Sequence, residues 1–314
     1  MLAGKLFIDG VDAYTNYGIT LLEGAYAALI ALPTFKKVEV TEWAEHDGVE
    51  ADLSAPKLDT RTLQLPFHIT DINGVDNFID VITDGAYHVY SITELGITKR
   101  LRLTAGQSLD ALHDRAKIVL TFADDFPVVP EANVTPSTLP VQQPDYEIDR
   151  TPFHELGISV LAGTDASIRK AAQVRPSLTV NISSLDGVVY DSGLVKFKSK
   201  DITLNLFIHA PTIEQFWARW NALFSILMQS GERRFYFRPL SAEWNCYYKS
   251  MAVKRMIVRN SDTWCEFSVT LTCTDYRPHG LWALLNAEEE GRVTVVVGGV
   301  EYHITVRART LSNQ

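Results

Sequence analysis

The stretch DGVVYDSGLVKFKSKDITLNLFIH, Asp186 to His209, sets the pattern of the chain. From Ile202 to Ile208 apolar residues alternate with others, and a period of two predicts a strand with one buried face. A helix is predicted from Thr212 to about Gln229, with Thr212 as its N-cap and Gln215 three residues later, as in a capping box. Its apolar stripe consists of Ile213, Phe216, Trp217, Trp220, Leu223, Phe224 and Leu227. The unit is therefore turn, strand, helix and a further strand at 234–237.

The same unit occurs earlier in the chain. Asp47-Gly48 lies 139 residues before Asp186-Gly187, and residues 62–69 match 201–208 at the same offset. Residues 17–24 match 156–163 in the same way, while 120–124 match 271–275 at an offset of 151. Two copies of this size indicate tandem domains rather than a solenoid, which needs three or more stacked units.

The predicted domains are residues 1–126 and 154–278. Between them, 127–153 is predicted to be a stiff linker because it holds Pro127, Pro130, Pro136, Pro140 and Pro144. Residues 279–314 form an extension that includes a β-hairpin around Gly298-Gly299. Each copy combines several antiparallel strands with one helix, so the fold class is α+β, mainly β. Residues 24–32 are predicted as a short helix or an exposed excursion.

Composition excludes several classes of protein. The chain has 314 residues and a formal charge of −9, from 38 acidic and 29 basic side chains, which argues against extensive binding to a nucleic-acid backbone. The three cysteines, Cys246, Cys265 and Cys273, form no CxxC pair and suit a reducing compartment. No apolar run is long enough to span a membrane, and the first ten residues lack the apolar core of a signal peptide.

Candidate chemical sites in the sequence have simpler structural explanations. No catalytic, cofactor-binding or metal-binding motif is found, and no cofactor is expected. His209 and His154-Glu155 lack a second ligand at helical or strand spacing. Adjacent strand residues such as Asp124-Asp125 point to opposite faces and cannot share one acid–base site. The basic and aromatic run at 233–238 could stack single-stranded nucleic acid, but it also suits a strand packed on the preceding helix.

Several of these segments together resemble one family. Phe7-Ile8-Asp9-Gly10, Tyr17-Gly18-Ile19, Asp47-Gly48 and residues 61–69 resemble the N-terminal domain of phage distal tail proteins, which is similar to tail-tube and baseplate-hub domains. The similarity covers about 1–126 and 154–278. Neither Asp-Gly loop has the arginine of the family pattern, and Lys200 stands where a basic residue is expected in the second copy.

The resemblance implies two tail-tube-like β-sandwich or split-barrel domains, each with one helix. It also implies a non-enzymatic virion structural protein at the tail tip or baseplate, assembled in the host bacterial cytoplasm. Its expected partners are copies of itself, in a hexameric ring or a trimeric pseudo-hexamer, the tail tube protein, and a tail hub or tail-associated protein. The ring would join the tail tube to the baseplate and let DNA pass without sequence-specific binding.

Two other readings remain open at the level of sequence. The first is a carbohydrate-binding β-sandwich module of a host-surface adhesin, which would need an exposed aromatic platform. Trp217 and Trp220 could contribute to such a platform, but at helical spacing with Phe216 and Phe224 they are more often core residues. The second is a hydrolase with dispersed carboxylates, for which the sequence offers no positive signal.

Overall fold

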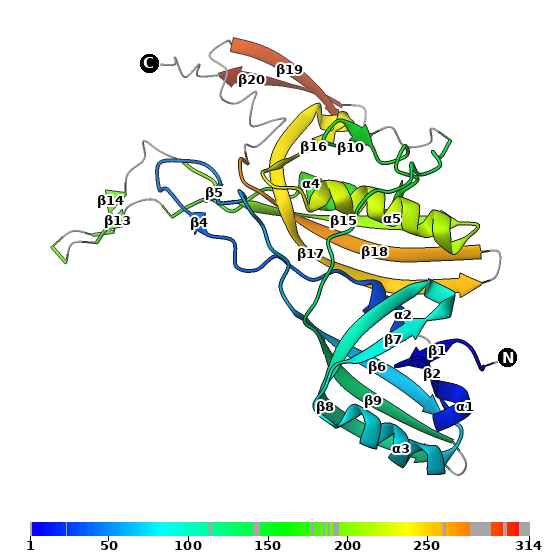
Figure 1. Ribbon diagram of the computed structural model, residues 1–314. Helices are drawn as coiled ribbons and strands as arrows, with labels where there is room; N and C mark the ends of the chain where they lie inside the picture. Colours follow the sequence, from blue (N-terminus) through cyan, green and yellow to red (C-terminus); the bar gives the residue numbers. More distant parts are fainter. Residues whose placement is uncertain are drawn as a thin grey trace.

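The computed structural model describes residues 2–22, 24–112, 115–140, 145–176, 179–181, 183–184, 186–187, 189–190, 195–259, 262–276, 290–297 and 300–307. In this part the chain is mainly β, with curled antiparallel sheets and a few helices, as the alternating patterns predict. Two large sheets dominate, one from each half of the chain, and the second lies above the first in Figure 1. No described helix is long and apolar enough to cross a membrane.

The first sheet has the order β2-β1-β7-β8-β9-β6-β3. Together with α1 (Ala13–Tyr17), α2 (Ala25–Ile30) and α3 (Ile72–Ile82), it forms what we call the first unit. A 3-10 turn, η1 (Thr93–Leu95), connects two of its strands. The strands are β1 (Leu6–Ile8), β2 (Val11–Asp12), β3 (Ile19–Leu21), β6 (Arg61–Ile69), β7 (His88–Ile92), β8 (Ile97–Leu112) and β9 (Arg115–Asp124).

The second sheet repeats this order as β11-β10-β16-β17-β18-β15-β12. With α4 (Thr164–Arg169), α5 (Ile213–Leu227) and η2 (Arg238–Leu240), it forms the second unit. Strand for strand the two orders correspond, which is what the repeat in the sequence predicts. The strands are β10 (Tyr146–Ile148), β11 (Thr151–Pro152), β12 (Ser159–Val160), β15 (Lys200–Ala210), β16 (Arg233–Phe237), β17 (Ala242–Arg259) and β18 (Asp262–Cys273).

The second unit begins inside the segment predicted to be linker. β10 and β11 lie within 127–153 yet pair into the second sheet, as β1 and β2 do in the first, so assigning all of 127–153 to a linker is wrong. The turn after each strand has positive φ, at Asp9-Gly10 and at Asp149-Arg150. Because arginine replaces glycine in the second turn, the usual sequence signal for this backbone conformation is missing there.

Strand register also corrects one part of the predicted repeat. Arg61 pairs with Asp124 and Lys200 pairs with Cys273, so Asp124 corresponds to Cys273 rather than to Asp275. The offset here is 149 residues, two fewer than the sequence match indicated. A slip of two residues leaves every side chain on the same face of the sheet, so the hydrophobic pattern cannot detect it.

Each sheet buries one face under its helix. In β15 the alternate residues Ile202, Leu204, Leu206 and Ile208 are buried, as the period of two predicts. Thr212 caps α5 through a hydrogen bond from Gln215 N to its Oγ1 at 3.3 Å. Phe216, Trp220 and Phe224 are buried, and the Trp220 ring centroid lies 5.0 Å from that of Phe267 in β18. This confirms the predicted core for three of the four α5 aromatics.

Trp217 differs from the other α5 aromatics. It is only partly buried, and its Nε1 donates to the backbone oxygen of Leu95 in the first unit at 2.7 Å.

Residues 24–32 form the short helix α2 rather than an exposed excursion, because Ala25, Leu29 and Ile30 are buried. The three cysteines are buried residues of β17 and β18.

Three smaller ribbons complete the described chain. β4 (Val40–Thr41) pairs with β5 (Glu50–Ala51), and β13 (Thr179–Val180) pairs with β14 (Val189–Tyr190). Near the C-terminus, β19 (Glu290–Val297) and β20 (Val300–Arg307) form the predicted hairpin, in which Val297 pairs with Val300. The Gly298-Gly299 dipeptide predicted at its turn lies outside the described residues.

Candidate functional site

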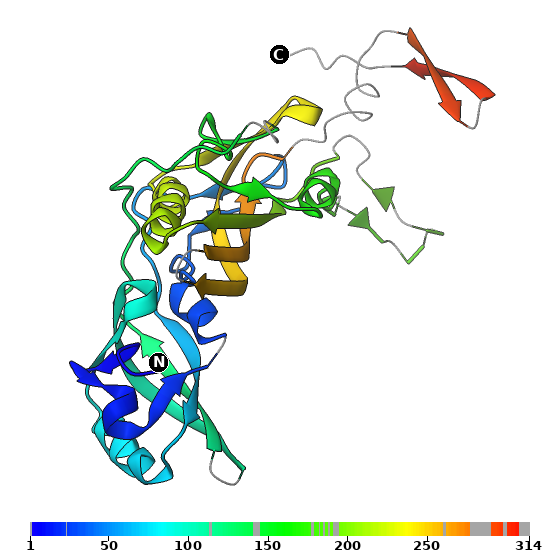
Figure 2. The same ribbon diagram turned by 90° about the vertical axis from the view of Figure 1, so that its right-hand side faces the viewer.

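Each unit extends one arm between its short helix and its first long strand. We call residues 35–58 arm 1, and the described residues between 174 and 197 (174–176, 179–181, 183–184, 186–187, 189–190 and 195–197) arm 2. An isolated bridge closes each base, Phe35 with Leu58 and Val174 with Phe197. Arm 1 carries β4 and β5, and arm 2 carries β13 and β14. Although the bridges and ribbons correspond at one offset, β13 and β14 project away from the body in both views (Figures 1 and 2). Arm 1 instead makes direct contacts with the second unit.

The base of arm 1 is held by β17 of the second unit. The Tyr248 hydroxyl donates to the backbone oxygen of Pro33 at 3.1 Å, and Leu32 N donates to the Met251 sulfur at 3.2 Å. Phe35 meets the Tyr248 ring edge-on, with centroids 5.6 Å apart. Burial raises the pKa of Tyr248, so its hydroxyl remains a hydrogen-bond donor. This contact fixes where the arm leaves the first unit.

The Asp47-Gly48 turn docks farther along the second unit. Gly48 N donates to Phe197 O at 2.9 Å, Val49 N donates to Thr274 O at 2.8 Å, and Phe197 N donates to the Asp47 carboxylate at 2.8 Å. Gly48 has φ +74°, and a Cβ there would lie 1.8 Å from Thr274 O. Glycine is therefore required both for the turn and for the close approach of the two backbones.

Charged side chains surround this turn. Arg175, at the base of arm 2, donates from Nη1 to Glu42 at 2.9 Å and from Nη2 to the backbone oxygen of Gly48. Lys196 lies 3.9 Å from the Asp47 carboxylate. The Arg175 side chain is only 10% exposed, whereas that of Glu42 is 55% exposed, so solvent still screens this ion pair. The turn is thus held by main-chain bonds and by charge.

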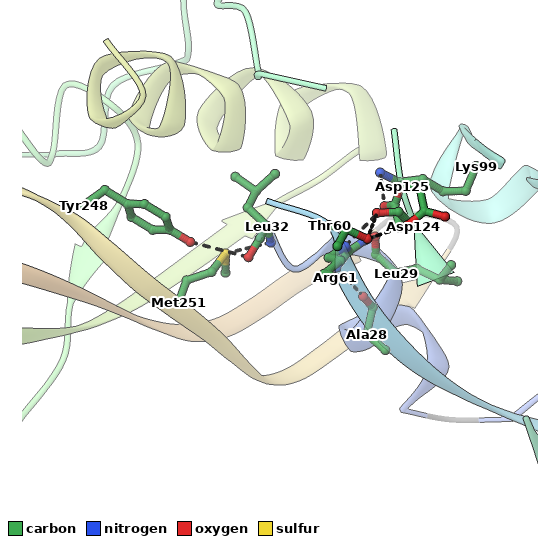
Figure 3. A network of polar contacts seen from close by, with 10 residues as sticks. All are labelled: Ala28, Leu29, Leu32, Thr60, Arg61, Lys99, Asp124, Asp125, Tyr248 and Met251. Atoms are coloured by element: carbon green, nitrogen blue, oxygen red, sulfur yellow. Dashed lines mark hydrogen bonds and ion pairs between the residues drawn. The ribbon is translucent and has the colours of Figure 1, made fainter. Parts of the chain in front are cut away.

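A buried cation organises the end of α2, from which arm 1 departs (Figure 3). Arg61 of β6 donates to the backbone oxygens of Ala28 and Leu29 at 2.8 Å each, and to the Asp124 carboxylate at 3.2 Å. Lys99 lies 3.2 Å from the same carboxylate. A cation at the C-terminal end of a helix satisfies carbonyls that lack partners within the helix. Arg61 therefore fixes the direction in which the chain leaves α2.

The second unit places Lys200 in the equivalent position. Its ammonium donates to the backbone oxygen of Ile168 in α4 and lies 5.0 Å from the Tyr276 ring centroid. Its strand partner is Cys273, where the first unit has Asp124. Burial lowers the pKa of Lys200 to about 8. The basic residue expected at the start of this strand is therefore a helix-capping group in both units.

A second pair of equivalent contacts ties the first strand of each sheet to the strand beside it. His88 is buried at the start of β7, with Nδ1 2.6 Å from Asp9 and Nε2 3.0 Å from Asp84. Burial alone would lower the pKa of His88, but the hydrogen bonds to Asp9 and Asp84 outweigh it and raise the pKa. In the second unit Arg233 lies 2.8 Å from Asp149. Comparing the two copies residue by residue did not reveal this pair, because the first copy has histidine where the second has arginine.

The histidine candidates are not brought together. His209 Nε2 lies 2.6 Å from Asp262 at an exposed hairpin end. The backbone oxygen of His154 accepts from Leu139 N at 2.8 Å, which fastens the end of the proline-rich segment to the second unit. Within the described residues no group of three or more His, Cys, Asp or Glu side chains is placed to hold a metal.

The remaining candidates have structural partners. Asp124 pairs with Arg61 and Lys99, whereas Asp125 accepts from Thr60 at 2.6 Å and from Tyr87 at 2.8 Å. The two carboxylates thus serve different partners, as expected for neighbours on a strand. In the 233–238 run, Arg233, Phe235 and Phe237 are buried, which favours the packing interpretation over nucleic-acid stacking. No sequence pattern marked Tyr248 or Arg175 as a binding residue, because their contacts with arm 1 depend on how the two units pack together.

Comparison with known proteins gives a distant likeness among solved structures. No protein-family model matches the sequence, and no curated protein matches it. Among solved structures, the chain is similar to the Dit (gp 19.1) protein of phage SPP1, described as a paradigm of the hub adsorption apparatus in phages that infect Gram-positive hosts. The two are 9% identical, the TM-score is 0.31, and the match covers 85% of this chain and 97% of that one.

Proposed function

We propose that the protein is a non-enzymatic structural component of a phage tail tip or baseplate, similar to distal tail proteins. It forms a ring that joins the tail tube to the baseplate. The observation that carries this proposal is the interface within the chain: two units with the same strand order lie in contact, and an arm of one is bound by the other. Units that already bind side by side are suited to continue around a closed ring.

The proposed partners follow from this role. Copies of the chain form the ring, as three or six subunits, and the tail tube protein and a tail hub or tail-associated protein bind above and below it. The protein is then a component of the virion tail, assembled in the host bacterial cytoplasm. A channel through the ring is polar and acidic or neutral, because a basic lining would retain passing DNA through its phosphates.

The test is the mass and shape of the purified full chain. We expect light scattering to give a discrete multiple of the chain mass of 35.1 kDa, and electron microscopy to show closed rings. If the chain alone is monomeric, the same measurements are repeated with the tail tube protein added. A protein that remains monomeric at high micromolar concentration under both conditions would refute the proposal, as would a ring whose channel is lined with lysine and arginine.

One observation favours carbohydrate binding as a second candidate. Trp43 in arm 1 is 48% exposed and lines a cavity of about 290 Å³ together with His46, Lys196 and Glu232. A half-exposed indole beside polar groups is a suitable surface for a sugar ring. A glycan array with the wild type and Trp43→Ala tests it: loss of binding in the variant supports a sugar site. Absence of binding by the wild type removes the candidate.

A further inference from the structure

The two Asp-Gly turns have the same backbone conformation but opposite surroundings. Gly48 has φ +74° and is buried against Thr274, whereas Gly187 has φ +84° and is exposed, and a Cβ there would meet no atom within 4 Å. The bases of the arms differ in the same way. Phe35 packs on Tyr248, while its counterpart Val174 is 54% exposed. Arm 2 thus presents the conformation of a docked turn without a surface to dock on.

The first unit carries a surface that corresponds to the one occupied by arm 1. Strand pairing matches Phe197 with Leu58, Lys196 with Lys57 and Thr274 with Asp125. Next to Asp125, Phe126 is 49% exposed and Val128 is 74% exposed. The Phe126 ring lies 4.9 Å from the Arg100 guanidinium. An exposed apolar patch of this kind marks a contact surface when it is contiguous.

We propose that arm 2 of one copy docks on the first unit of the next copy and repeats the contact that arm 1 makes within the chain. The inference rests on the proposed function and identifies the segments that join the subunits. Gly187 N would donate to Leu58 O, Leu58 N would donate to the Asp186 carboxylate, and Asp186 would pair with Lys57. Each of these bonds copies one that the structure contains at Gly48, Phe197, Asp47 and Lys196.

The occupant is a second copy because the two surfaces belong to the same repeated fold. Within one chain, arm 1 already occupies the docking surface of the second unit. Arm 2 and the corresponding surface of the first unit are then available to bind another copy. Such an interface is head-to-tail, and it closes into a ring or continues as a filament according to the rotation between copies.

The contact between copies would be weaker than the one inside the chain. Leu103 stands where Tyr248 supplies its hydroxyl, because Leu103 pairs with Phe122 as Tyr248 pairs with Leu271. The joined units within a chain also benefit from a high effective concentration, which separate copies lack. Assembly is therefore concentration-dependent, and it is sensitive to the ion pair between Asp186 and Lys57.

A charge swap tests the proposal. Sedimentation of the full chain over a concentration series gives the association constant of the wild type, Asp186→Lys, Lys57→Asp and the double variant. We expect each single variant to associate at least about tenfold more weakly, and the double variant to recover most of that loss. Glu131→Lys, at an exposed site, controls for the change in net charge made by Asp186→Lys and should match the wild type.

Gly187→Ala gives an independent readout. It should weaken association, because a docked turn would bring its Cβ against the Asp125 backbone, as Gly48 approaches Thr274. Gly10→Ala is the matched control, since Gly10 has φ +82° and also has no atom within 4 Å of an added Cβ. Equal association by both variants would overturn the inference, since the strain in the two turns is the same.

The outcomes separate this inference from the proposed function. Closed rings that are unaffected by the charge swap overturn the docking of arm 2 but leave the ring intact. Open filaments that depend on Asp186 and Lys57 support the docking and refute the ring. A wild type that stays monomeric at high micromolar concentration overturns the docking, and the experiment with added tail tube protein then decides the proposed function.

Discussion

Replacing Gly48 by alanine tests whether arm 1 is bound to the second unit. At φ +74° any residue with a Cβ is strained by about 1–2 kcal/mol. In addition, the new Cβ would lie 1.8 Å from Thr274 O, so the turn must withdraw. Withdrawal breaks the bonds from Gly48 N and Val49 N, each worth about 0.5–1.5 kcal/mol net. We therefore expect a total loss of about 2–5 kcal/mol.

Gly187→Ala is the control, because Gly187 has φ +84° and open space around an added Cβ. It should cost only the backbone strain, about 1–2 kcal/mol. Both variants are measured by urea unfolding with tryptophan fluorescence, at a protein concentration low enough to keep copies apart. Hydrogen exchange should rise at Gly48 and Val49 in the first variant alone. Equal losses of stability and unchanged exchange at these amides would refute the docking of arm 1.

Three further predictions concern the core and two buried cations. Trp220→Ala removes a buried ring and should cost about 3–5 kcal/mol in urea unfolding; an unchanged midpoint would mean that Trp220 is not a core residue. Burial lowers the pKa of Lys200 to about 8 from 10.5, so the unfolded chain holds this proton more tightly. The unfolding free energy of the wild type relative to Lys200→Met should thus rise by about 3 kcal/mol between these pH values, and a flat difference would contradict the buried ammonium. His88 has a raised pKa, so its contribution is complete below its ordinary pKa of 6.5 and is lost as pH rises through the raised value. Relative to His88→Arg, which copies Arg233, wild-type stability should fall over that range, and a constant difference would exclude the charged pair with Asp9 and Asp84.

Much of the fold follows from the sequence because it depends on local periodicity. The alternation at Ile202 to Ile208 and the stripe of α5 each identify one buried face, and the Asp-Gly turns mark the repeat. These signals are local, since a strand or helix shows its buried face through the spacing of its own residues. The repeat of Asp47-Gly48 at Asp186-Gly187 also predicted that two units share one plan, and the matching strand orders agree with it.

Only the tertiary structure decided how the units meet. The two Asp-Gly turns match in sequence, yet Gly48 is buried against Thr274 and Gly187 is exposed. Nothing in either turn encodes this difference, because it depends on whether another unit lies within reach. In the same way, Trp217 matches the core pattern of α5 but bonds to Leu95 of the first unit. Periodicity reports which face of an element is covered, whereas the covering surface is set by long-range packing between residues far apart in the chain.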